Sequence, residues 1–170
     1  MSELALCLNG DSAFTPPSHI LENISEEMAR RSVTGAPHTI YAEVWHMAYW
    51  QQITLHWVSG IETPCPDSAA EGFPAADEEE SWDVLRKRFL DGAEEAAKVA
   101  HDAAGLERAI RCPSPAGKPT RTMTVREQLE SLAAHNGYHL GRVVLLRQML
   151  GSWPPPSGGF TWSGVSAWVL

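Results

Sequence analysis

Cysteine, positive charge and long apolar runs are all scarce in this 170-residue sequence. Its three cysteines, Cys7, Cys65 and Cys112, are odd in number, lie far apart and include no C-x-x-C pair. We therefore expect reduced thiols and a cytoplasmic protein rather than a disulfide framework. The N-terminal stretch has neither a basic region nor a long apolar run, so it does not match a secretory signal peptide.

Basic residues number 13 against 21 acidic ones, which gives a formal net charge of −8. The sequence contains no run or stripe of lysine and arginine, which a nucleic-acid partner requires. Its apolar runs are also shorter than the roughly 20 residues that a membrane-spanning helix needs. The sequence therefore predicts binding to neither nucleic acid nor membrane.

The length fits one domain over residues 1–170. Apolar residues recur at helical spacing in four stretches, which are residues 18–32, 39–59, 81–105 and 124–151. The second stretch is apolar on more than one face, so we expect it to be buried or to meet a second subunit. Ser81 as N-cap and the capping box Thr124–Glu127 mark the starts of the last two helices. This pattern predicts an all-α fold, a four-helix bundle.

Two further segments complete the predicted architecture. Residues 110–112 and 120–123 flank a proline-rich turn and can form a short β-hairpin between the third and fourth helices. The C-terminal tail, residues 157–170, follows three consecutive prolines, and we expect it to be irregular. Its aromatic residues Trp162 and Trp168 indicate that it packs against another part of the protein.

The main functional signal is the pair His135 and His139, an H-x-x-x-H inside the last predicted helix. Four residues advance an α-helix by about 400°, so the two imidazoles lie on one face, a turn apart. Two neutral imidazoles in this arrangement suit a divalent cation such as Zn²⁺ or Ni²⁺. From the pair alone, two ordinary buried or surface histidines explain the spacing equally well, and a metal needs at least one more ligand.

His46 is the best candidate for that third ligand. It lies in the second predicted helix among residues that we expect to be buried, and a buried histidine needs a polar partner. His56 follows ten residues later and is rotated by about 80°, so it cannot face the same ion. We assign the remaining histidines to helix ends, turns or solvent: His19, His38 and His101.

Three segments together resemble the DinB/YfiT-like superfamily: AEVWHMAYWQ around His46, LAAHNGYHLGRVVLLRQMLG around the histidine pair, and the tail SWPPPSGG. The resemblance covers nearly the whole chain. It implies a four-helix bundle, usually a homodimer, with one metal ligand on the second helix and two on the fourth. Carried onto this sequence, the ligands are His46, His135 and His139. Three imidazoles suit zinc or nickel.

A three-ligand site leaves an open coordination position, as catalytic metal sites do. Asn136 stands where the H-E-x-x-H pattern has its glutamate base, so protease-like hydrolysis has no visible base on this motif. Relatives in the superfamily include transferases and isomerases in which the metal activates a low-molecular-weight thiol, and such chemistry on a small-molecule substrate is favoured. A metal-dependent hydrolase, a metal-binding dimer without turnover and a dimer with purely structural histidines remain as alternatives.

Two other residues are secondary candidates for the site. Glu43 precedes His46 by three residues and could orient a ligand or act as a base, the alternative being a solvated or salt-bridged carboxylate. Arg142 follows His135 by seven residues and points in nearly the same direction. It could hold the carboxylate of a substrate or thiol cofactor, the alternative being an arginine that pairs with an acidic side chain.

Overall fold

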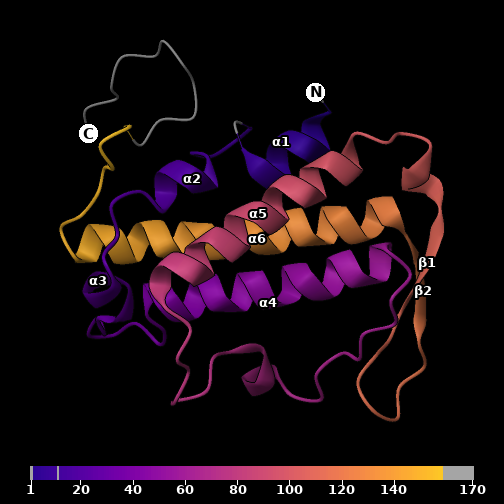
Figure 1. Cartoon of the computed structure of the whole chain (residues 1–170), viewed down its shortest axis with the longest axis horizontal. Coiled ribbons are helices and arrows are strands. Elements are labelled where there is room, and N and C mark those ends of the chain that lie inside the picture. Colours follow the sequence, from indigo (N-terminus) through magenta and orange to yellow (C-terminus); the bar gives the residue numbers. More distant parts are fainter. Residues whose placement is uncertain (1, 11, 159–170) are drawn as a thin grey trace.

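The computed structural model describes residues 2–10 and 12–158, and it is mostly helical (Figure 1). Its centre consists of three long helices, which are α4 (Ile40–Val58), α5 (Trp82–Ala100) and α6 (Val125–Met149). Helices α4 and α6 lie side by side, and α5 packs across them. The predicted all-α bundle is therefore confirmed, and each long helix begins within two residues of the start expected from the sequence.

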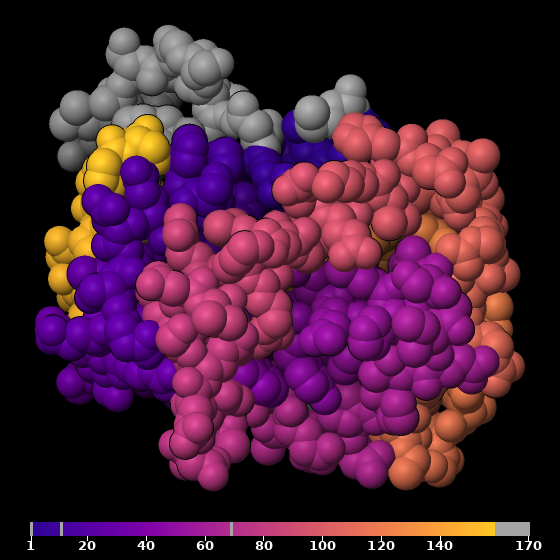
Figure 2. Space-filling model, viewed as in Figure 1, coloured from indigo at the N-terminus to yellow at the C-terminus, as the bar shows by residue number. Residues whose placement is uncertain are grey.

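Three short helices complete the bundle: α1 (Glu3–Asn9), α2 (Pro17–Ile20) and α3 (Glu26–Arg30). Helix α1 packs on α5 and α6, whereas α3 packs on α4 and α5. In the space-filling view, these N-terminal helices and α5 cover most of α6 on the face shown (Figure 2). Helix α1 was not predicted from the sequence, although the side chain of Ser2 caps it by accepting a hydrogen bond from the amide of Ala5.

The single helix predicted over residues 18–32 is wrong, because the chain breaks between α2 and α3. Asn23 adopts a left-handed conformation with φ of 51°, which asparagine tolerates better than most residues and which no α-helix contains. Ser25 then caps α3 by accepting a hydrogen bond from the amide of Met28. Leu21 and Ile24, on either side of the break, are nevertheless buried.

The starts of α5 and α6 follow the caps that the sequence indicated. The side chain of Ser81 accepts a hydrogen bond from the amide of Val84, and the capping box between Thr124 and Glu127 is formed. Helix α5 buries an apolar stripe against α4 and α1 and leaves its acidic residues exposed. The buried stripe consists of Trp82, Leu85, Phe89, Ala93, Ala96 and Ala100.

The predicted hairpin is also confirmed. Strands β1 (Ala109–Cys112) and β2 (Arg121–Thr124) pair antiparallel, with Ala109 opposite Thr124. Strand β2 runs directly into α6, so the hairpin closes the end of the bundle where α6 begins (Figure 1).

Three other expectations concern the rest of the chain. All three cysteines are free thiols, as predicted. Within residues 2–10 and 12–158, no helix is both long enough and apolar enough to cross a membrane. The tail from residue 159 onward, including Trp162 and Trp168, lies outside the described residues.

Candidate metal centre

Helices α4 and α6 bring the three predicted ligands together. One side-chain nitrogen from each of His46, His135 and His139 lies within 4.8 Å of the others. The Nε2 atoms of His46 and His135 are 3.0 Å apart, and the ring centroids of His135 and His139 are 4.5 Å apart. The H-x-x-x-H on α6 and the histidine on α4 thus form one cluster, the set of three that the family resemblance implied.

The loop between α4 and α5 holds the ring of His46. Its Nδ1 donates a hydrogen bond of 2.6 Å to the carbonyl oxygen of Gly72, and Phe73 stacks on the same ring with a centroid distance of 4.2 Å. A carbonyl oxygen can only accept, so the proton of the neutral ring is on Nδ1 and the lone pair is on Nε2. Burial lowers the pKa of His46 below its ordinary value, which favours this neutral form.

The side chain of Glu43 holds His139 in the same way. His139 Nδ1 donates to Glu43 Oε2 at 2.6 Å, and the two residues are only 6% and 0% exposed. A carboxylate that accepts from the outer nitrogen of a histidine fixes the ring's orientation and makes its other nitrogen a better metal ligand. Nε2 of His139 is therefore free to face the cluster.

Glu43 also forms an ion pair with Arg142, whose Nη2 atom lies 2.8 Å from Glu43 Oε1. The solvated Glu43 considered from the sequence is thus wrong, and the salt-bridged alternative describes its position. Both oxygens of Glu43 face cationic or N–H groups, so the carboxylate is engaged rather than free to take a proton from a substrate. Binding of a substrate carboxylate by Arg142 stays a prediction.

His135 is the third member of the cluster and is half-buried. Burial lowers its pKa from 6.5 to about 4, so its ring is neutral at physiological pH. Its Nδ1 lies 3.2 Å from Oδ1 of Asn136. An amide can donate from one side and accept on the other, so this contact alone does not fix which ring nitrogen of His135 carries the proton.

The cluster fits the requirements of a divalent cation. Two imidazole nitrogens bound tetrahedrally to zinc at 2.0–2.1 Å lie about 3.3 Å apart, close to the 3.0 Å between the Nε2 atoms of His46 and His135. All three rings are within reach of one ion, and at least two of them are held by acceptors on their outer nitrogens. These residues therefore can hold a metal with three protein ligands and one open position.

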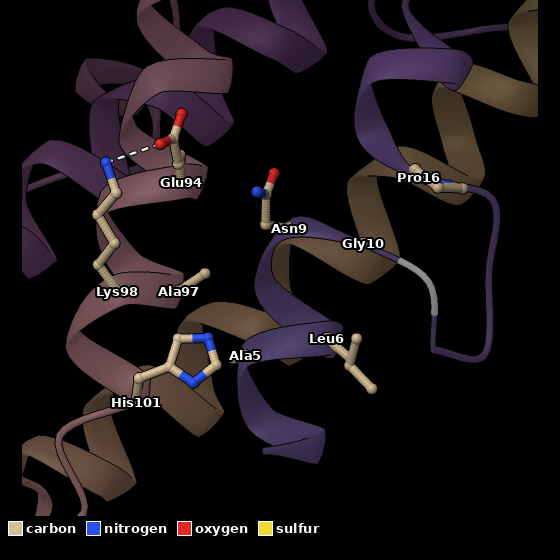
Figure 3. Close-up of a pocket in the computed structure, with 9 residues that line it drawn as sticks. All are labelled: Ala5, Leu6, Asn9, Gly10, Pro16, Glu94, Ala97, Lys98 and His101. Atoms are coloured by element: carbon tan, nitrogen blue, oxygen red, sulfur yellow. Dashed lines mark ion pairs between the residues drawn. The ribbon is translucent and has the colours of Figure 1, made fainter. Parts of the chain in front are cut away.

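The other histidines lie outside the cluster. His56 is near the end of α4, and its Nδ1 lies 2.8 Å from Thr63 Oγ1. His101 is the C-cap of α5, where the sequence analysis placed it, and lines a pocket of about 440 Å³ between α1 and α5 (Figure 3). His38 lies in the turn before α4, as expected, but it is half-buried rather than solvated and stacks on Phe73 with a centroid distance of 4.1 Å.

Several residues that contact the cluster were not predicted from the sequence. Phe73 lies between the rings of His38 and His46, and Gly72 supplies the acceptor for His46. Both belong to the loop between α4 and α5, which has no periodic pattern that would place it over α4. No signal in the sequence could have identified their contacts.

Comparison with known proteins identifies the family of the chain. The sequence profile of the DinB superfamily matches residues 18–143, a segment that contains all three histidines of the cluster. No curated protein matches the chain.

Proposed function

Because the chain belongs to the DinB superfamily, we propose that His46, His135 and His139 hold a divalent metal ion, zinc or nickel, and that the protein is a metal-dependent enzyme acting on a small molecule. One observation carries this proposal. The ligand atoms converge within 4.8 Å, and acceptors on the outer nitrogens of His46 and His139 leave the lone pair of each ring on its inner nitrogen. Histidines that only fill the core would have no reason to converge at one point.

Thiol-transferase chemistry is the favoured reaction. A divalent cation with an open position supplies a Lewis acid that lowers the pKa of a bound water or thiol and polarises a carbonyl. The protein side chains nearest the cluster support a reaction that needs no separate base. Asn136 is an amide, and the carboxylate of Glu43 is buried and held between His139 and Arg142. We therefore favour a low-molecular-weight thiol as the nucleophile.

A metal-dependent hydrolase is the second candidate, since the same Lewis acid can activate water. Its weakness is the absence of a free base on the H-x-x-x-H motif, where Asn136 stands in place of glutamate. The third candidate is a metal-binding dimer without turnover, in which no substrate reaches the open coordination position.

An activity panel separates these candidates. Metal-loaded and chelator-treated protein would be assayed with low-molecular-weight thiols plus electrophilic acceptors, and in parallel with ester and amide substrates. We expect metal-dependent thiol transfer that is lost in His135→Ala and retained in His101→Ala, whose ring lies outside the cluster. Turnover of esters or amides alone would favour the hydrolase. Absence of metal-dependent turnover in both sets would contradict an enzymatic role.

We also propose that the protein is a homodimer. Three exposed apolar side chains lie on α6 at positions i, i+7 and i+11, where they share one face of the helix: Tyr138, Leu145 and Met149. Large apolar side chains that share an exposed helix face are typical of a contact with another protein. The face is continuous with the cluster, since the Tyr138 ring packs edge-on against His139.

A further inference from the structure

Two buried amide side chains connect His135 to the backbone of α5. Asn136 is 2% exposed, and its Nδ2 donates a hydrogen bond of 3.2 Å to Oε1 of Gln51 on α4. Gln51 is 1% exposed, and its Nε2 donates a bond of 2.9 Å to the carbonyl oxygen of Phe89. With the 3.2 Å contact between Asn136 Oδ1 and His135 Nδ1, these bonds form a continuous chain across three helices.

The carbonyl of Phe89 determines the direction of every bond in this chain. Because a backbone carbonyl can only accept, the NH₂ group of Gln51 must face it. The oxygen of Gln51 then faces Asn136, which must present its own NH₂ group to Gln51 and its oxygen to His135. That oxygen can only accept, so this chain of bonds favours the neutral His135 ring with its proton on Nδ1, whereas in the metal-free protein the 3.0 Å contact between the Nε2 atoms of His46 and His135 favours a proton on His135 Nε2. Reversing either amide would place two acceptors against each other in a buried site, which costs about 1–3 kcal/mol.

A glycine on α5 makes room for the chain. A Cβ atom at Gly92 would lie 2.3 Å from Nε2 of Gln51, far inside any tolerated contact. Gly92 is one helical turn beyond Phe89, so α5 supplies both the acceptor for Gln51 and the space that the amide occupies. Glycine in a helix interior is destabilising by about 1 kcal/mol relative to alanine. Its presence here has a packing reason.

We propose that Gln51 and Asn136 act as positioning residues for His135: anchored on the Phe89 carbonyl, they hold its ring with Nδ1 protonated and Nε2 turned toward His46. This inference rests on the proposed metal site. It adds His135 to the two histidine rings of that site whose orientation is already explained. His46 is held by a carbonyl, His139 by a carboxylate and His135 by a relay of two amides. All three Nε2 atoms then present lone pairs to one point.

The protonation state of the ring can be measured directly in the metal-free protein. Long-range ¹H–¹⁵N spectra of ¹⁵N-histidine-labelled protein distinguish a ring protonated on Nδ1 from one protonated on Nε2, and the spectrum of His135→Gln assigns the signal. We expect His135 to carry its proton on Nδ1. In Gln51→Met, which keeps the volume and removes both bonds, the signal should shift toward the Nε2-protonated form. Gln52→Met, its exposed neighbour, should leave the signal unchanged.

Zinc affinity provides the second measurement. Loss of an outer-shell partner lowers metal affinity by 10- to 100-fold, so we expect roughly a 10-fold loss in Gln51→Met and none in Gln52→Met. Gly92→Ala should weaken zinc binding because its Cβ displaces Gln51. The double variant should bind no more weakly than Gln51→Met alone, because both changes act through one side chain. Thermal melts check that each variant is folded.

The outcomes separate this inference from the metal proposal. A wild-type His135 protonated on Nε2, or equal zinc affinities in folded Gln51→Met and Gln52→Met, would overturn the relay while leaving the metal site intact. If wild-type protein bound no zinc or nickel, the proposed function would fail. The spectra of the metal-free protein would still decide whether the relay holds the ring.

Discussion

Glu43 and His139 form a buried pair in which His139 Nδ1 donates to Glu43 Oε2 over 2.6 Å. Helices α4 and α6 supply one partner each, so the bond ties together the two helices that carry the histidine cluster. Burying a carboxylate is unfavourable unless charged or hydrogen-bonding groups surround it. Here His139 and Arg142 provide those groups, and the pair orients a ring that faces His46 and His135.

The first prediction concerns this pair. Glu43→Gln keeps the size of the side chain but removes the negative charge that Arg142 and His139 share. We expect zinc affinity to fall about 10-fold, the lower end of the range for outer-shell partners. Isothermal titration with zinc would measure it. Glu62→Gln is the matched control, because Glu62 forms an exposed ion pair with Arg111. Equal affinities in the two variants would show that Glu43 does not support the metal.

The second prediction is a pH dependence of stability in the metal-free protein. Burial lowers the pKa of His135 to about 4, whereas an imidazole in the unfolded chain titrates near 6.5. Between these values the unfolded state binds more protons than the folded state, so stability is full above about pH 6.5 and is lost as the pH falls toward 4. After allowance for solvent screening, we expect His135 to contribute on the order of 2 kcal/mol to this loss.

Urea denaturation at about pH 7.5 and about pH 4.5 would measure that contribution. The free energy of unfolding should fall by less in His135→Gln than in the wild type. His101→Gln, which changes an exposed histidine, should behave as the wild type does. A His135→Gln variant with the same pH dependence as the wild type would contradict the prediction.

The third prediction tests the loop that holds His46. In Gly72→Ala the new Cβ would lie 3.1 Å from Trp50 Nε1 and 3.3 Å from His46 Nδ1, which is tighter than ordinary contact. The loop must shift, and the carbonyl of Gly72 shifts with it. We expect zinc affinity to fall several-fold, approaching 10-fold if the hydrogen bond to His46 is lost. Ala70→Ser, in the same short 3₁₀ turn but exposed, should have no effect.

The fourth prediction concerns the dimer. Leu145→Glu places a charge in the middle of the exposed apolar face of α6, and a buried unpaired charge is strongly unfavourable at an interface. We expect sedimentation equilibrium to report a dimer for the wild type and a monomer for this variant. Val84→Glu changes a similarly exposed residue on α5 and should leave the dimer intact. A monomeric wild type would rule the dimer out.

The sequence pattern was sufficient for the long helices and for the histidine pair on α6. Helices α4, α5 and α6 have apolar residues at helical spacing and capping residues at their starts, and both signals depend only on local sequence. His135 and His139 share a face because of helix geometry. The addition of His46 required the resemblance to a family, because nothing in the spacing of α4 and α6 fixes how the two helices are rotated against each other.

Two kinds of feature were not predicted from the sequence: a local break in the first helix, and side-chain contacts that depend on long-range packing. The break at Asn23 replaces one expected helix with two short ones, because local turn and capping preferences win over a weak apolar pattern. Gln51 is five residues after His46, about 140° round α4, so it does not share the face of His46. It reaches the site only through Asn136. From sequence, Asn136 indicated a missing base; in the structure it contacts His135.

The most direct test of the metal site is the metal content of freshly purified protein. Elemental analysis should find close to one zinc or nickel ion per chain in the wild type, and little in His46→Ala, which removes one of three ligands. The metal should also raise the thermal midpoint of the wild type but not of the variant, because a ligand that binds only the folded state stabilises it. Absence of stoichiometric metal in the wild type, with unchanged thermal behaviour in His46→Ala, would contradict the site.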